Sequence, residues 1–558
     1  MTHPRKHLPA PAAVPEGATA TPPRKSHSSR NRHSSSGNYR NAPPTGPSLS
    51  KYGELFQEVQ DEVSYFLPVD ALAAGTYRYL YHLGDYSPAS IAQMQQFLSE
   101  KRETLAHLDQ GKLSNAEHRS ALILMPYIDS ISRLLESGYF DDTLWQLRNA
   151  RKGIYQLLYM TEIPMYIRGK AIVHRFEELY TPPTAPAQTI QFLSDSHRKV
   201  ALEELHLMIQ YLDFAEDKAS RFDDKQIIAE RVQKTRQYLG RIEMRAGSGG
   251  STSVSPRGPL ASVLFSSFDE AQAAETQGHL EREIDVLRRQ LTEKAGQIDG
   301  SRPPERVLEE TLSASLERKL DQTALDVWMN TDYPRLRSFF PGYKLLPTPV
   351  PSAAEGSLLP PYDASEALSL KGTSLEGRQT VCPIVFSRRC LSPELAIMMT
   401  YFPGKAYIQS AISSWDPGLP FNIQRTTFIS ALALFELQNL ADLDGMMTPA
   451  NSLLATLMLL IEDVASALDL GILQNRLSHG DAASYFREQL PLSADLAASF
   501  STTATSDYGF SLARFVARSR LRELRKASRA SNKKVSWTTF YRGLLEQGTF
   551  DPVQLHSP

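Results

Sequence analysis

The residues with the clearest capacity for chemistry are basic ones near the C-terminal end. Arg514, Arg518, Arg522 and Arg525 fall on one side of a helix with about 3.6 residues per turn. Guanidinium groups at that spacing can clamp a phosphate or a carboxylate, because each presents a rigid fork of N–H donors. The alternative is a helix face that is solvated or neutralised by salt bridges within the chain, and we favour it.

Other residue types that often carry chemistry are sparse. Cys382 and Cys390 are too few for a disulfide framework and do not match a four-ligand zinc pattern, so we expect two reduced thiols. His479 stands alone beside Gly480, which favours a polar turn over a metal ligand. No stretch resembles a phosphate-binding glycine loop or a nucleophile elbow. We therefore expect no cofactor.

The charge and hydropathy of the chain indicate which classes of partner are not expected. The 558 residues include 60 Lys plus Arg and 62 Asp plus Glu, a net charge of -2, which does not favour nucleic acid or an anionic membrane as the main partner. The longest apolar run, around Leu453 to Ile461, ends at Glu462 and Asp463 and is shorter than the roughly 20 residues that a membrane span needs. We expect no transmembrane helix.

Residues 1–50 form a tail of Pro, Ser, Ala, Thr and basic residues in which Glu16 is the only acid. Such a composition cannot bury enough apolar surface to fold, so we expect disorder. An acid-poor start with Ser and Arg could also be an address, either an organellar transit peptide or a bacterial export signal. The predicted location is cytoplasmic, and the alternative is export by a secretion system through this tail.

Periodic apolar residues predict a helical N-terminal lobe over 51–245, a flexible linker over 246–262 and a helical C-terminal lobe over 263–558. Ser87-Pro88 reads as an N-cap followed by proline at the first helical position. The stripe Leu280, Ile284, Leu287 and Leu291 favours packing on the chain's own body over a coiled coil. Frequent prolines predict short strands and loops between about 330 and 380. Helices are expected at 114–137, 141–160, 164–180, 194–215, 223–243, 268–298, 464–472, 481–489, 512–530 and 537–547.

Two groups of short motifs, read together, resemble one bacterial family. The first runs from Pro68 through Gly75 to Leu83-Gly84-Asp85-Tyr86-Ser87-Pro88. The second contains Tyr401-Phe402-Pro403-Gly404, Arg425 to Phe435, Asp469-Leu470-Gly471-Ile472, Leu521 to Arg525 and Phe540 to Gly548. In this order and at these spacings, the motifs resemble the family called domain of unknown function 885.

Members of that family resemble zinc peptidases, so the resemblance implies a site of two histidines, a glutamate ligand and a glutamate general base. This chain departs from the pattern at every one of those positions. Met399 and Lys405 replace the histidines, Thr400 replaces the base, and Ser430 replaces the glutamate ligand. Because a thioether, an ammonium and two hydroxyls cannot hold zinc as a peptidase does, we expect no metal and no catalytic residue.

The losses extend to the residues that the resemblance places around substrate. Leu473 replaces a histidine, Ala465 an arginine and Arg514 a tyrosine. A shifted alignment does not restore the site, because residues 386–444 contain no histidine.

The resulting expectation is a mostly α fold, a zinc-peptidase-like body of two lobes around a cleft with minor short strands. Its function would be that of a non-catalytic pseudopeptidase that binds or regulates, taking a peptide, a small anionic ligand or another protein in the cleft. Lys405 would either replace the zinc charge by attracting a carboxylate or point into solvent. The alternatives are an enzyme with metal-free or unrelated chemistry in the same cleft and an exported effector; the oligomeric state cannot be read. The predicted ligand-binding residues are Lys405, Tyr407, Ser430, Arg514 and Arg518.

Overall fold

The computed structural model describes most of the chain between Ser50 and His556 as helices and the turns that join them. Within these residues there is no strand. The tail at 1–49, most of the predicted linker, both cysteines and nearly all of the segment expected to hold short strands lie outside the described residues. The described ranges are 50–140, 142–160, 163–181, 195–247, 270–316, 423–443, 445–506, 509–531, 535–547 and 555–556, with isolated positions between 327 and 420.

The N-terminal half forms a series of helices. From residue 114 on, their bounds lie close to those expected from the apolar pattern, except that the helices expected over 194–215 and 223–243 each continue four residues further, to Ala219 and Gly247. They are α1 (Lys51–Phe66), α2 (Pro68–Ala73), α3 (Pro88–Ala106), α4 (Asn115–Glu136), α5 (Thr143–Tyr159), α6 (Met165–Glu178), α7 (Asp195–Ala219) and α8 (Lys225–Gly247), with a short 3-10 turn η1 (Gln110–Lys112).

Local caps fix where these helices start. The Ser87 hydroxyl accepts a hydrogen bond from the Ser90 N–H, and Pro88 occupies the first turn, which confirms the predicted N-cap. Ser114 and Glu117 form a capping box at the start of α4, in which each side chain accepts from the other residue's backbone N–H.

A sharp turn before α3 is held by aromatic packing. Gly84 has φ +107°, a conformation that favours glycine, and the Tyr86 hydroxyl donates to the Leu83 carbonyl oxygen at 3.0 Å. The Tyr86 ring contacts Phe66, Phe140 and Trp145. This explains Gly84 and Tyr86 in the Leu-Gly-Asp-Tyr-Ser-Pro stretch as structural residues.

Gly84→Ala is expected to lower the free energy of unfolding by about 2 kcal/mol, because an L side chain is strained at this φ. The added Cβ would also overlap the Tyr86 hydroxyl and lie 3.0 Å from the Phe66 carbonyl oxygen. Gly240→Ala, in α8 with open space around it, is the matched control and should stabilise by about 0.5–1 kcal/mol. Urea unfolding of both variants checks this, and equal effects would contradict it.

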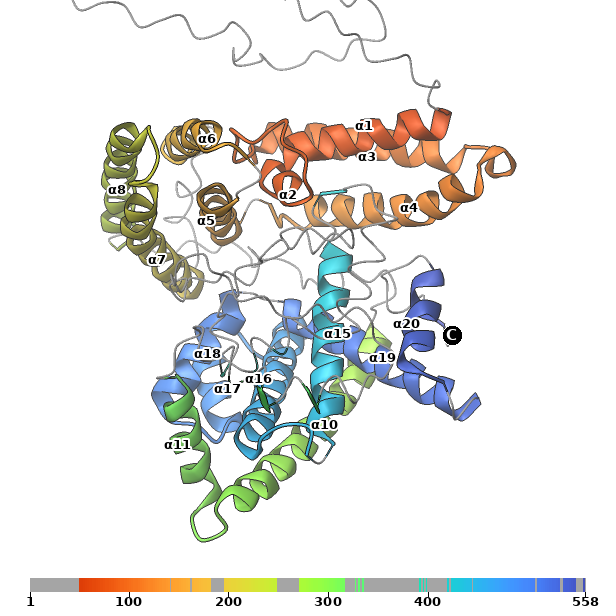
Figure 1. Cartoon of the computed structure of the whole chain (residues 1–558), viewed down its shortest axis with the longest axis vertical. Coiled ribbons are helices and arrows are strands. Elements are labelled where there is room, and N and C mark those ends of the chain that lie inside the picture. The colour runs from red at the N-terminus through yellow and green to blue at the C-terminus, as the bar shows by residue number, and fades with distance from the viewer. Residues whose placement is uncertain are drawn as a thin grey trace, which may run out of the picture. The chain divides into compact units, whose positions relative to one another are not determined.

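The C-terminal half is a second set of helices, coloured green to blue in Figure 1. Three of them, α11, α15 and α18, were not among the individual helices expected from the sequence. They are α10 (Glu270–Ile298), α11 (Pro304–Leu316), α15 (Ile423–Ala441), α16 (Pro449–Leu473), α17 (Ala482–Gln489), α18 (Ala494–Ser506), α19 (Phe510–Ser531) and α20 (Trp537–Glu546), with a 3-10 turn η3 (His479–Asp481).

Helix α16 lies at the centre of this set and contacts α10, α15, α17, α18 and α19. It is buried along almost its whole length, as expected for a helix that is apolar on all sides. The stripe of α10 is buried in the core of the protein itself, so the prediction of packing on the chain's own body is confirmed. Any acidic residue of α16 must therefore find a partner inside the protein.

Ser50–Pro558 forms one compact unit, so the division into lobes at 245 and 263 stays a prediction. One apolar cluster includes residues of α1, α3 and α4 together with Leu470 of α16 and Leu512 of α19. The Tyr127 hydroxyl of α4 donates to the Pro420 carbonyl oxygen at 2.6 Å. Among the described helices, none has both the length and the apolar character to cross a membrane.

Candidate functional site

Four of the residues singled out by the sequence, Met399, Thr400, Lys405 and Tyr407, lie outside the described residues. Their roles stay predictions, including that of Lys405 as a substitute for the zinc charge. Ser430 lies on α15 and is half-buried. The remaining two, Arg514 and Arg518, lie on α19 and face acidic residues of α16.

Arg514 is joined to Glu462. Its Nη2 and Nε atoms lie 2.8 and 3.2 Å from Glu462 Oε2, and Nη2 also donates to the Ser511 hydroxyl at 3.0 Å. Both charged side chains are about nine-tenths buried. Removal from water makes the pair hard to break, because neither charge can be left alone in a core.

Arg518 and Asp463 form a second pair one turn further along α19. Arg518 Nη2 lies 2.5 Å from Asp463 Oδ1, and each side chain is only 1% exposed. Burial raises the pKa of Asp463 to about 6, while Arg518 opposes that rise. The carboxylate is thus ionised at pH 8 and depends on Arg518 for compensation.

Arg522 continues the series by contacting a third helix. Its Nη1 atom lies 2.8 Å from Glu283 Oε2 on α10. Burial raises the pKa of Glu283, but His279 and Arg522 lower it more, to about 2. The three pairs together tie α19 to α16 and to α10.

The basic face of α19 is thus largely neutralised within the chain, which agrees with the salt-bridged alternative expected from the sequence. A ligand-binding role for Arg514 and Arg518 stays a prediction, because any ligand would have to compete with Glu462 and Asp463 for their donors.

A third acid of α16, Asp469, stands at the start of α19. It is 1% exposed, and its Oδ2 atom accepts a hydrogen bond from the Leu512 N–H at 3.1 Å. Burial raises the pKa of Asp469 to about 7, although hydrogen bonds from the backbone N–H groups of Gly509 and Leu512 lower it. Asp469 therefore caps α19 and titrates near neutral pH.

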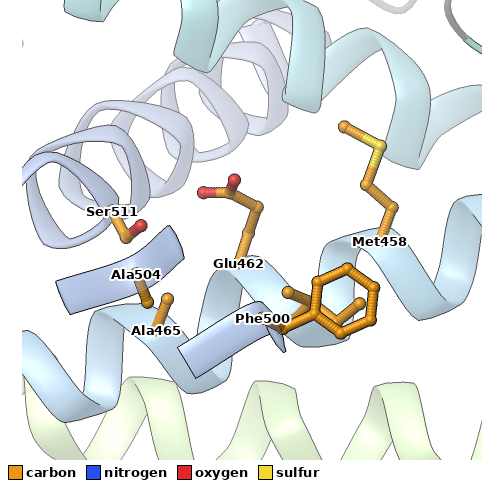
Figure 2. Close-up of a pocket in the computed structure, with 7 residues that line it drawn as sticks. Met458, Glu462, Ala465, Phe500, Ala504 and Ser511 are labelled. Atoms are coloured by element: carbon orange, nitrogen blue, oxygen red, sulfur yellow. The ribbon is translucent and has the colours of Figure 1, made fainter. Parts of the chain in front are cut away.

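A small recess opens beside the first ion pair, between α16, α18 and α19 (Figure 2). Its cavity volume of about 20 Å³ has room for about one water molecule. Figure 2 shows Glu462 between Ser511 and Met458, with Phe500 beside it. The lining is mostly apolar and consists of Met458, Ile461, Glu462, Ala465, Phe500, Ala504 and Ser511.

Ala465 lines the recess and Arg514 is bonded to Glu462 of its lining; these are two of the positions that the resemblance assigns to the surroundings of a substrate. In the part of the chain that the structure describes, no three His, Cys, Asp or Glu residues are grouped so that they could hold a metal ion. The chemical resources of the site are one neutralised carboxylate, one hydroxyl and an apolar surface.

The sequence analysis did not identify the acidic residues of α16 as partners of α19, although the sequence contains a pattern that indicates them. Glu462, Asp463 and Asp469 interrupt an otherwise apolar helix, and arginines recur at steps of four on α19. Acids inside a buried helix require cations or N–H donors nearby, and α19 was the most basic stretch of the chain.

The sequence matches no protein-family model and no curated protein. Its fold is similar to two solved structures. One is described as "a putative lipoprotein of unknown function" from Shewanella oneidensis, with 13% identity, a TM-score of 0.58, and coverage of 90% of this chain and 98% of that one. The other is described as a "putative lipoprotein" from Colwellia psychrerythraea, with 12% identity, a TM-score of 0.61, and coverage of 89% and 96%. At these identities the likeness shows a shared fold and nothing about activity.

Proposed function

We propose that this chain is a non-catalytic binding protein, a degenerate relative of the zinc peptidases of domain of unknown function 885. In this proposal a peptide binds over the recess between α16, α18 and α19. The observation that carries the proposal is the pair of buried ion pairs, Glu462–Arg514 and Asp463–Arg518. These four charged groups already neutralise one another, which supports a role without catalysis.

The recess lining supports an apolar contact with the ligand. The apolar side chains of Met458, Phe500 and Ala465 line the recess, and the Glu462 carboxylate in the lining is already neutralised by Arg514. Of the three expected ligand types, these surroundings favour a peptide with an apolar side chain over a small anion. Because the cavity is small, entry requires Met458 and Phe500 to change rotamer, which the unbranched methionine side chain permits.

The proposal is tested by methyl NMR of protein labelled at methionine and titrated with acetyl-Ala-Leu-Ala-amide. We expect the Met458 signal to shift and saturate, while that of Met244, which is 71% exposed on α8, stays in place. Ala465→Leu fills the recess and should abolish the shift. Ala271→Leu, at an exposed position of α10, is the matched control and should not.

A second arm separates binding from catalysis. The same peptide is incubated with the protein and equimolar zinc, and mass spectrometry should find it intact. Cleavage that disappears in Glu462→Gln would assign an enzyme to this site. Absence of any Met458 shift would remove the recess as the binding site.

For location, we propose the alternative, export, in place of the cytoplasmic location that the sequence predicts. The support is the description of both structural neighbours as "putative lipoprotein" and the acid-poor composition of residues 1–50, which contain Ser and Arg. A reporter fused to residues 1–50 and expressed in a bacterium should leave the cytoplasm. Retention of the fusion in the cytoplasm would restore the first prediction.

A further inference from the structure

The last arginine of the basic face, Arg525, differs from the three before it. It is 6% exposed, yet no carboxylate contacts it within the described part of the chain. Its Nη2 atom donates to the Val535 carbonyl oxygen at 3.2 Å. Among the described residues, its Nε and Nη1 atoms are buried and have no hydrogen-bond partner.

Aromatic rings hold this guanidinium in place. Its central carbon lies 4.1 Å from the ring centre of Trp537 and 5.2 Å from that of Phe540, both on α20. Stacking occupies the face of the guanidinium plane and leaves its edge for in-plane hydrogen bonds. The rings therefore fix the orientation of the group without supplying an acceptor.

Two more donors share this face of α19. Ser528 is fully buried, and its hydroxyl has no partner among the described residues. Ser528 lies three residues after Arg525, and the exposed Arg529 lies four residues after Arg525. The three side chains therefore lie on the same side of the helix. Arg529 adds positive charge at the solvent-facing edge.

Burial and the neighbouring Arg529 lower the pKa of Arg525 to about 10, which leaves it charged at neutral pH. A buried cation beside a second cation is costly when, as here, its Nε and Nη1 donors have no acceptor among the described residues, and an anion would supply one. A phosphate group would supply the missing acceptors, because its several oxygens can accept from Arg525, Ser528 and Arg529 at once.

We propose that Arg525, Ser528 and Arg529 form an anion site that takes a phosphate group between the end of α19 and the start of α20. This site is distinct from the recess and independent of the peptide-binding proposal. Of the four arginines that the sequence analysis considered as an anion clamp, only Arg525 keeps that role in this proposal.

The test is thermal unfolding in inorganic phosphate, phenyl phosphate, acetate and chloride at equal ionic strength. Saturating phosphate should raise the melting temperature by about 2 °C over chloride. Equal effects of phosphate, acetate and chloride would show that only general charge screening acts and would overturn the site. If phosphate alone stabilises, the site takes the free ion; if phenyl phosphate does so as well, it also takes a phosphomonoester.

Variants locate the effect. Ser528→Ala and Arg529→Gln should each reduce the phosphate-dependent shift at least by half, and Arg525→Gln should remove it. Arg306→Gln, which removes an exposed charge from α11, is the control and should retain the full shift. If Arg525→Gln does not fold, the other two variants still decide the outcome, and a full shift in both would exclude these residues as ligands.

Discussion

Arg518→Met is expected to lower the free energy of unfolding at pH 8 by about 3–5 kcal/mol, because it removes one partner of a buried ion pair. In the variant, the Asp463 side chain is still only 1% exposed but has lost the guanidinium that lies 2.5 Å from its Oδ1 atom in the parent protein. Urea unfolding measures the loss. Arg306→Met, the same change at a side chain that is 72% exposed, should cost under about 0.5 kcal/mol.

The loss in Arg518→Met should shrink as the pH falls. The pKa of Asp463 is raised by burial and lowered by Arg518, so removing Arg518 raises it further. Below that pKa, Asp463 of the variant is protonated and neutral, so the cost of an unpaired buried charge disappears. The double variant Asp463→Leu with Arg518→Met should recover most of the loss, because it replaces both charges with apolar groups. A loss that is constant with pH and persists in the double variant would mean that packing, not charge, is responsible.

Asp469 is expected to make the protein more stable as the pH falls from about 7 to about 4. Its pKa in the folded protein is raised from 3.8 to about 7. Between pH 3.8 and about 7 the folded protein keeps a proton on Asp469 that the unfolded chain releases. The contribution of Asp469 to the free energy of unfolding is therefore fully present below pH 3.8 and is lost as the pH rises through about 7. The whole change amounts to at most about 4 kcal/mol.

Asp469→Asn tests this assignment, since the amide oxygen can still accept from the Leu512 N–H and cannot ionise. The variant should be more stable than the parent at pH 8 and should lose most of the pH dependence between 4 and 7. Asp285→Asn, at a side chain that is 71% exposed on α10, should leave that dependence unchanged. An unaltered slope in Asp469→Asn would assign the titration to another buried acid.

The prediction of individual helices succeeded where the signals were local. The Ser87-Pro88 start of α3 follows from the capping preferences of those two residues, and the stripe of α10 follows from the helical period. Helix α18 was missed because Ala, Ser and Thr dominate it and give no clear apolar stripe. The start of α16 was missed because a helix that is apolar on all sides has little periodicity.

The site was less predictable. The sequence singled out Arg514 and Arg518, but their partners Glu462 and Asp463 lie 52 and 55 residues away along the chain. No periodicity within one helix reveals which acid on another helix will face it. The expectation of a ligand clamp and that of a salt-bridged face could therefore be separated only once α16 and α19 were placed side by side.

By itself, the sequence determined that this protein is helical and where most of its helices lie. These properties depend on residue type and on spacing within a few turns. Only the tertiary structure decided that Arg514, Arg518 and Arg522 pair with the protein's own carboxylates, while Arg525 contacts no carboxylate in the part of the chain that the structure describes. The reason is physical: identical guanidinium groups on one helix differ in chemistry only through the neighbours that packing supplies, and burial makes that difference large.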